Sequence, residues 1–219
     1  MSVVYIVDDD AAVRDSLRWL LESVNLPVRS FANATDFLSE FEPDEPGCVV
    51  LDVRMPGMSG LELQTHLLAT AQSIPIIFIS GHGDIAMAVH TVKSGAIDFI
   101  VKPFSDQELL DRIHRALELS QERISERKRR ADLVARLARL TSRERQVLKL
   151  IGAGRANKMI AAALNLAEKT IEAHRTNLNR KLGATSVADL VRIAIECEEL
   201  LTAPPAADSA GPASPPIVN

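Results

Sequence analysis

The chain has 219 residues, 47% hydrophobic and 25% charged, a composition typical of a globular protein with a hydrophobic core. Its length suits one large domain or two small ones. The first residues, MSVVYIVDDD, have no basic region before their apolar run, which argues against a signal peptide, and no apolar stretch is long enough to cross a bilayer. Cys48 and Cys197 lie far apart without metal-ligand spacing. We therefore expect a reduced protein of the cytoplasm with no membrane partner.

The net charge of −4 is unevenly distributed along the chain. Residues 1–118 carry 8 basic against 18 acidic residues, whereas residues 139–199 carry 11 basic against 7 acidic residues. An acidic front and a basic rear predict two domains with different partners, and a polyanion is the candidate partner of the rear domain.

Short apolar runs alternate with helical patterns through residues 1–118. Apolar and β-branched runs predict strands at 3–7, 28–31, 49–52, 76–79 and 99–101. Apolar residues at helical spacing predict helices at 11–23, 34–41, 61–68, 85–93 and from 107 onward. This alternation predicts a parallel sheet with helices on both faces, joined by right-handed crossovers. We expect Trp19 and the leucines of the first helix to lie in the core.

The strand signals stop after Leu119. The charged segment 119–138, with ERKRR near its centre, predicts a linker helix that continues the helix before it. Apolar residues recur every seven positions along both segments, which favours either a dimer seam or, since the last two are small, a solvated helix. The residues with this spacing are Leu110, Leu117, Ile124, Ala131 and Ala138.

Residues 139–200 predict a small all-α domain of four helices. The stretch TSRE is a capping box that opens the first helix. We expect Asn157 to cap the second helix, and Gly183 to end the third. The second, third and fourth helices are expected at 158–164, 168–182 and 186–200. The last segment, 201–219, is rich in Pro, Ala and Ser, and we expect it to be disordered.

Chemically active side chains follow four of the predicted strands, namely Asp8, Asp9 and Asp10, then Asp52, then Ser80, and then Lys102. The carboxyl ends of the strands in a doubly wound sheet form its ligand crevice, so these side chains should meet there. Crowded carboxylates suit a hard divalent cation such as Mg²⁺, which takes carboxylate, water and phosphate oxygens. A carboxylate can also accept a phosphoryl group, and Lys102 can bind phosphate. Asp10 has the alternative role of capping the next helix.

Residues 1–118 resemble the receiver domain of bacterial two-component response regulators in VYIVDDD, VVLDVRMPGMSGLEL, PIIFISGHGD and SGAIDFIVKPF. The resemblance implies a flavodoxin-like, doubly wound domain of five parallel strands in the order 2-1-3-4-5. It also implies that a sensor histidine kinase phosphorylates Asp52 and that the domain slowly removes this phosphate itself. By the same resemblance, Mg²⁺ is held by Asp8, Asp9, Asp52 and the backbone carbonyl of Arg54, while Lys102 binds phosphate and Ser80 and Phe99 form a switch pair.

The helices expected at 158–164 and 168–182, with a short turn between them, predict a helix-turn-helix. A basic face on the second helix suits a DNA major groove, although many small helical bundles have such a face. The stretch LTSRERQVLKLIGAGRANKMIAAALNLAEKTIEAHRTNLNRKLGATSVADLV resembles the LuxR-type DNA-binding domain of the NarL/FixJ family, in its FixJ-like branch. The resemblance implies that 168–182 is the recognition helix.

The same resemblance assigns individual DNA contacts. Base-facing positions are Glu172, Ala173 and Thr176. Phosphate-contacting positions are Lys158, Lys169, Thr170, Arg175, Arg180 and Lys181. The chain departs from the family at Ala167, where members commonly have a capping Ser, and this loss costs about 1 kcal/mol of helix stability.

The sequence therefore predicts a phosphorylation-dependent transcription regulator that binds double-stranded DNA, pairs as a homodimer when phosphorylated, and acts near RNA polymerase. One alternative is a Mg²⁺-dependent aspartyl-phosphate phosphatase that uses Asp8 and Asp10, against which Asp52 on a separate strand and the attached helix-turn-helix both argue. Another is a receiver that is never phosphorylated and serves as a plain DNA-binding or protein-docking module.

Overall fold

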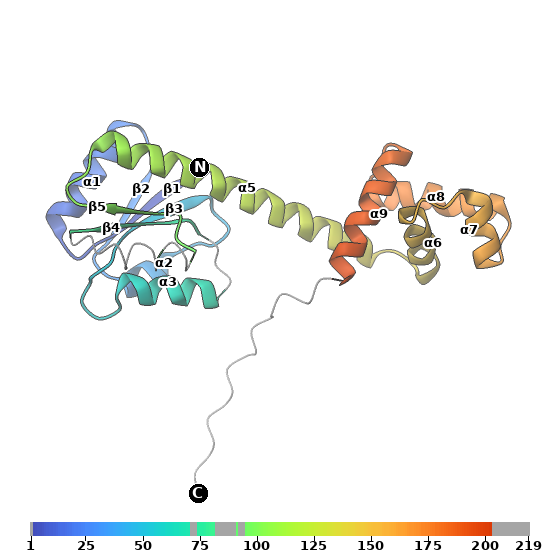
Figure 1. Cartoon of the computed structure of the whole chain (residues 1–219), viewed down its shortest axis with the longest axis horizontal. Coiled ribbons are helices and arrows are strands. Elements are labelled where there is room, and N and C mark those ends of the chain that lie inside the picture. Colours follow the sequence, from blue (N-terminus) through green and yellow to red (C-terminus); the bar gives the residue numbers. More distant parts are fainter. Residues whose placement is uncertain (1, 71–73, 82–90, 92–94, 203–219) are drawn as a thin grey trace, which may run out of the picture. The chain divides into compact units, whose positions relative to one another are not determined.

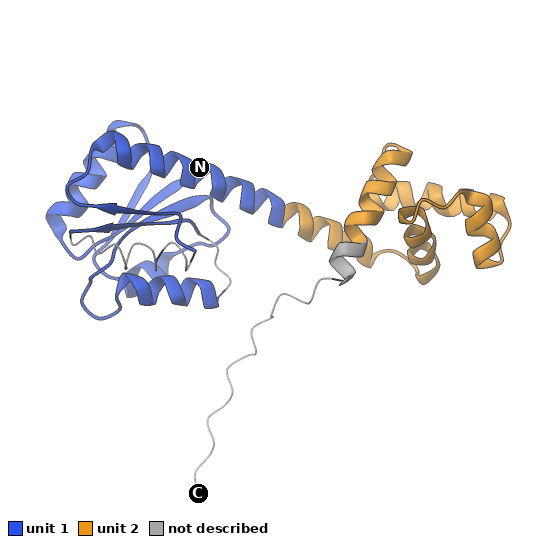
Figure 2. Cartoon of the chain, in the orientation of Figure 1, with its two compact units in different colours: residues 1–127 blue, residues 128–219 orange. Residues whose placement is uncertain are grey.

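The structure is a computed structural model of the whole chain (Figure 1), and it describes residues 2–70, 74–81, 91 and 95–202. The chain forms two compact units, Met1–Arg127 and Lys128–Asn219 (Figure 2). The predicted linker segment 119–138 is therefore divided between the two units. The helix predicted at 85–93, except Thr91, and the tail from residue 203 lie outside the described residues.

Unit 1 is built on a five-stranded parallel sheet with the order β2-β1-β3-β4-β5, which confirms the predicted topology. Its strands are β1 (Val3–Val7), β2 (Val28–Phe31), β3 (Gly47–Asp52), β4 (Ile76–Ser80) and β5 (Asp98–Val101). Every residue of β1 and β4 is buried, because strands covered by helices on both faces need apolar side chains in both directions.

Helices cover both faces of this sheet (Figure 1). They include α1 (Ala11–Ser23), α2 (Ala34–Glu40), α3 (Gly60–Ala69) and α5 (Asp106–Ala138). On one face Tyr5 and Phe78 pack with Phe37 of α2 and Leu63 of α3. A second hydrophobic core forms on the other face, where α1 and α5 meet the sheet. The period-two alternation of the strands sends neighbouring side chains into the two different cores.

The expected burial of Trp19 is wrong, since this side chain is 78% exposed. Leu17 and Leu21 of the same helix are buried, as expected for residues one helical turn apart that face the sheet. Trp19 lies two positions from each of them, on the opposite side of the helix.

Unit 2 contains α6 (Ser142–Gly152), α7 (Asn157–Leu164), α8 (Glu168–Leu182) and α9 (Val187–Thr202) around one hydrophobic core. The predicted capping box of Thr141 and Glu144 is present, and Gly183 ends α8 with a φ of 72°. The expected cap Asn157 is wrong, because Ala156 is the N-cap of α7 and makes no side-chain hydrogen bond there.

The heptad positions of α5 do not form one exposed seam. Leu117 and Ile124 are each only 8% exposed, and Leu117 packs in the core of unit 1. Ala131 and Ala138 are exposed.

None of the helices in the described part of the chain is long and apolar enough to span a membrane.

Candidate functional site: a carboxylate–lysine cluster and a helix-turn-helix

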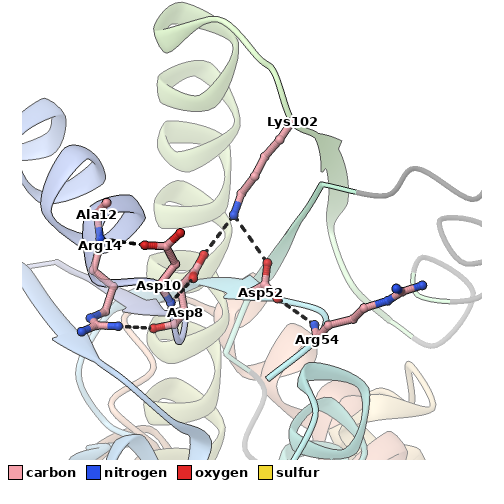
Figure 3. Close-up of polar contacts among 7 residues, drawn as sticks. All are labelled: Asp8, Asp10, Ala12, Arg14, Asp52, Arg54 and Lys102. Carbon is pink, nitrogen blue, oxygen red and sulfur yellow. Dashed lines mark hydrogen bonds and ion pairs between the residues drawn. The ribbon is translucent and has the colours of Figure 1, made fainter. Parts of the chain in front are cut away.

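Asp8, Asp52 and Lys102 meet beyond the carboxyl ends of β1, β3 and β5. The Nζ atom of Lys102 lies 3.1 Å from Oδ2 of Asp8 and 3.5 Å from Oδ1 of Asp52 (Figure 3). The Asp8 side chain is 5% exposed and the Asp52 side chain 13% exposed. The structure therefore brings together three of the predicted site residues from three different strands, with Asp52 the more accessible carboxylate.

Backbone N–H groups hold the two carboxylates, and one arginine holds the backbone of Asp8. The Asp10 N–H donates to Asp8 Oδ1 at 2.9 Å, and the Arg54 N–H donates to Asp52 Oδ2 at 2.7 Å. Arg14 of α1 donates from Nη1 to the Asp8 carbonyl oxygen at 2.7 Å. Sequence reasoning missed Arg14, because nothing in its spacing from Asp8 indicates this contact.

The environment of Asp52 is electrostatically unfavourable for its charged form. Burial raises the pKa of Asp52 above its usual value, and the nearby Asp8 carboxylate raises it further. The hydrogen bond from the Arg54 N–H and the Lys102 ammonium act in the opposite direction. The Asp8 and Asp52 carboxylates thus share the ammonium of Lys102, so a further cation bound at the cluster would be electrostatically favourable.

Gly60 brings the start of α3 against the backbone of Asp52. A Cβ atom at this position would lie 2.2 Å from the Asp52 carbonyl oxygen and 3.1 Å from side-chain atoms of Leu51 and Phe78. Ser59 and Glu62 form a capping box that begins α3 at this point. The resemblance to receiver domains already points to the Ser59-Gly60 turn as part of the loop after Asp52, and the Ser-x-x-Glu pattern there is a helix-start signal. No local pattern indicates the close approach of Gly60 to the Asp52 carbonyl.

Ser80 and Phe99, the predicted switch pair, lie on neighbouring strands. Ser80 ends β4 and is 3% exposed, and its carbonyl accepts the Lys102 N–H at 2.8 Å. Phe99 of β5 is half-buried beside the core that contains Phe78, its partner in the sheet register. The peptide between Lys102 and Pro103 is cis.

Asp9 and Asp10 differ from Asp8 in their surroundings. Asp9 is exposed, and within the described ranges no three His, Cys, Asp or Glu side chains are grouped closely enough to hold a metal ion. Asp8 and Asp52 still fit Mg²⁺, because this ion takes one or two carboxylates and fills its other positions with water and phosphate oxygens. Asp10 caps α1 by accepting the Ala12 N–H at 2.8 Å, which leaves it poorly placed for the phosphatase chemistry considered above.

The outward face of α8 in unit 2 carries most of the predicted DNA contacts. The exposed residues among them are Lys158 of α7 and Lys169, Glu172, Ala173, Thr176 and Arg180 of α8. Thr170 and Arg175 are half-buried, and Arg175 donates from Nη1 to Asn157 Oδ1 at 3.4 Å. Ala167 caps α8 without a side-chain hydrogen bond, as the sequence predicts.

Lys181 is engaged within the protein. Its Nζ donates to Glu144 Oε2 at 2.7 Å and to the Arg139 carbonyl oxygen at 3.2 Å. The Glu144 side chain is 5% exposed. Burial alone would raise the pKa of Glu144, but the hydrogen bonds from Lys181 and Thr141 outweigh it and lower the pKa. Through these contacts Lys181 joins α8 to α6 and to the residue after α5.

Two family models match the two units of the chain. The response regulator receiver domain matches residues 4–114. The luxR family of bacterial regulatory proteins matches residues 138–194. The two matches follow the division into an α/β sheet domain and a helical domain that the structure shows.

Relatives align with this chain over most of their length. The response regulator protein TodT of Pseudomonas putida is 46% identical over 192 residues, which cover 88% of this chain and 85% of TodT. The transcriptional regulatory protein FixJ of Bradyrhizobium diazoefficiens is 42% identical over 192 residues, 88% of this chain and 94% of FixJ. A solved structure of the response regulator StyR matches with a TM-score of 0.81 and 47% identity, covering 89% of this chain and 98% of StyR. This chain therefore belongs to the NarL/FixJ family of two-component response regulators, transcription regulators that join a receiver domain to a LuxR-type DNA-binding domain.

Proposed function

We propose that a sensor histidine kinase phosphorylates this regulator on Asp52 in the presence of Mg²⁺, and that the phosphate controls DNA binding by α8. The position of the Lys102 ammonium between the Asp8 and Asp52 carboxylates is the observation that carries this proposal. Asp52 is the acceptor because its side chain is the more exposed of the two carboxylates, 13% against 5% for Asp8, and so is easier for a phosphodonor to reach.

The chemistry is a transfer between two residues. A carboxylate oxygen of Asp52 attacks the phosphorus of a phosphohistidine, the P–N bond breaks, and its electron pair goes to the imidazole nitrogen, which takes a proton from solvent. Lys102 offers its charge to the oxygens of the transferred group, as a compact ammonium can. Asp8, Asp9, Asp52 and the Arg54 carbonyl would hold Mg²⁺, which when bound neutralises phosphoryl charge.

The phosphate acts on Ser80 and Phe99. It adds a charge of about −1.5 to −2 and three acceptor oxygens beside the buried Ser80 hydroxyl. Ser80 donates to these oxygens, and the half-buried Phe99 turns inward to fill the space that Ser80 leaves. The balance between two conformations of unit 1 shifts in consequence.

The helix α8 lies in the major groove when the protein binds DNA. Glu172, Ala173 and Thr176 face bases, and the phosphate contacts are Lys158, Lys169, Thr170, Arg175 and Arg180. We leave Lys181 out of this set because Glu144 holds it. Two phosphorylated copies bind two half-sites, since one helix-turn-helix buries little surface, and RNA polymerase at the adjacent promoter is the further partner.

Acetyl phosphate labelling followed by intact-protein mass spectrometry tests the acceptor assignment. Wild-type protein with Mg²⁺ should gain one phosphate, and Asp52→Asn should gain none while keeping its circular dichroism spectrum. Asp9→Asn serves as a comparison that retains the acceptor and should still be labelled, more slowly. Full labelling of Asp52→Asn would refute the assignment.

A further inference from the structure

Residues 128–138 at the end of α5 are built into the DNA-binding unit. Leu133 is 8% exposed and belongs to the same hydrophobic core as Ile171 and Leu178 of α8. Arg129 places Nη2 3.1 Å from Glu196 Oε1 on α9. This segment therefore shares the hydrophobic core with α8 and forms an ion pair with α9. It is part of the fold of unit 2 as well as its covalent link to unit 1.

Arg136 of this segment holds the C-terminal end of α8. Its Nη1 donates to the Leu182 carbonyl oxygen at 2.9 Å, and its Nη2 lies 2.6 Å from Asp132 Oδ2. Leu182 is the last residue of α8, so its carbonyl has no partner within the helix. A cation at this end also complements the helix dipole. Asp132, one turn earlier in α5, orients the guanidinium toward α8.

Gly183 leaves room for this contact. Its φ of 72° is a conformation that ends helices and that other residues rarely adopt. A Cβ atom here would also lie 2.6 Å from Arg136 Nη1. In the reverse direction, Lys181 of α8 donates to the Arg139 carbonyl at 3.2 Å. Two hydrogen bonds of opposite direction thus join the end of α8 to the end of α5.

The other helix of the helix-turn-helix is held in the same way. Arg143 of α6 donates from Nη2 to the carbonyl oxygen of Leu164, the last residue of α7, at 2.6 Å. The N-caps of the two helices, Ala156 and Ala167, make no side-chain hydrogen bonds. Each helix is therefore fixed at its C-terminal end by an arginine from a neighbouring helix, while its N-terminal end has no side-chain cap.

We propose that Arg136 is a positioning residue for DNA recognition, and that its hold on the Leu182 carbonyl sets the orientation of α8. A helix of 15 residues is about 22 Å long, so a tilt of about 5° at its C-terminal end moves the other end by about 2 Å. Base contacts are lost by such a shift, whereas contacts between flexible basic side chains and phosphates adapt to it. Loss of Arg136 therefore weakens binding to the specific sequence more than binding to DNA in general.

Full-length variants test this role. A duplex is selected from random sequence with phosphorylated wild-type protein, and fluorescence anisotropy measures Kd for it and for a scrambled duplex over a salt series. Arg136→Met should bind the selected duplex about tenfold more weakly, on the scale of one hydrogen bond to a charged group. Arg130, an exposed arginine of the same segment, provides the control variant Arg130→Met. The affinity of Arg136→Met for the scrambled duplex, and its slope of log K against log salt, should change no more than they do in Arg130→Met. Arg136→Lys should recover most of the loss.

The thermal midpoint of each variant shows whether it is folded at the temperature of the binding measurement, so that a loss of affinity is not caused by unfolding. If Arg136→Met is unfolded there, Arg136→Lys is the milder change to measure. Equal affinities of Arg136→Met and Arg130→Met for both duplexes would overturn the role. The role would also be overturned if Arg136→Met lost the same affinity for both duplexes and its slope of log K against log salt were smaller in magnitude by about 0.9. That result is expected when a side chain contacts a DNA phosphate directly.

Because this inference rests on the proposed function of α8, Lys169→Met and Thr176→Ala are measured alongside. If neither weakens binding, α8 is not the reading helix and the proposed function fails. If they weaken binding and Arg136→Met does not, only the positioning role is refuted.

Discussion

Asp52 shows how a residue can be placed for reaction at the expense of folding. Burial and the Asp8 carboxylate raise its pKa, in spite of the Arg54 N–H and Lys102. The native state therefore holds the Asp52 proton more tightly than the unfolded chain, in which the pKa is about 3.9. Stability falls as the pH rises from this value through the folded pKa, and at neutral pH the ionised carboxylate destabilises unit 1.

Asp52→Asn should consequently raise the thermal midpoint of unit 1 at pH 7 in the presence of EDTA. The difference in thermal midpoint should shrink as the pH is lowered through the raised folded pKa of Asp52, because the carboxyl group of the folded wild type then becomes neutral. Added Mg²⁺ should reduce the difference in thermal midpoint at pH 7, because it should stabilise the wild type more than Asp52→Asn. Calorimetry at a series of pH values measures this, and a variant less stable than wild type at pH 7 would contradict the electrostatic account of the site.

Gly60 makes a second residue-scale prediction. Gly60→Ala places a methyl group against the Asp52 carbonyl oxygen, 2.2 Å away before relaxation. We expect a loss of about 1–3 kcal/mol in the free energy of unfolding, as for other overpacked sites. Gly81→Ala is the matched control, because a Cβ atom there meets no atom of the described residues within 4 Å. Urea denaturation measures both variants, and equal stabilities would show that α3 does not depend on this close approach.

Between elements, the Lys181–Glu144 pair joins α8 to α6. Lys181→Met leaves the buried Glu144 without its cation and should cost about 2 kcal/mol at pH 7. The folded pKa of Glu144 is lowered, so its contribution is present above its unfolded pKa of about 4.3 and lost as the pH falls through the folded value. The difference should therefore be largest at neutral pH, and Lys181→Met combined with Glu144→Gln should recover part of it. A loss that does not change between pH 7 and pH 3 would exclude the ion pair as its cause.

The elements were predictable where local pattern determines them. The bounds of β1, β2 and α1 agree with the expected ranges, because β-branched runs and helical spacing are properties of neighbouring residues. Asn is a common N-cap residue, so the sequence predicts that Asn157 caps α7, but the helix begins one residue earlier, with Ala156 as its N-cap. The placement of Lys181 and Arg136 depends on partners 37 and 46 positions away, which no local pattern reveals. The cluster of Asp8, Asp52 and Lys102 was predictable because parallel strands bring their carboxyl ends to one edge.

For the whole molecule, the central relation is between a phosphate on unit 1 and DNA bound by unit 2. The helix α5 contributes to both units. Ser120 accepts the Gly47 N–H at 3.0 Å in unit 1, and Leu133 lies in the core of unit 2. The helix α5 therefore has tertiary contacts within each unit.

A direct test is the affinity of full-length protein for its selected duplex with and without acetyl phosphate, at fixed salt and Mg²⁺, for wild type and Asp52→Asn. We expect phosphorylation to strengthen binding by wild type between about 5-fold and 150-fold, the usual range of coupling between sites, and to leave Asp52→Asn unchanged. The same affinity for phosphorylated and unphosphorylated wild type, or an equal gain in Asp52→Asn, would contradict control of DNA binding through Asp52.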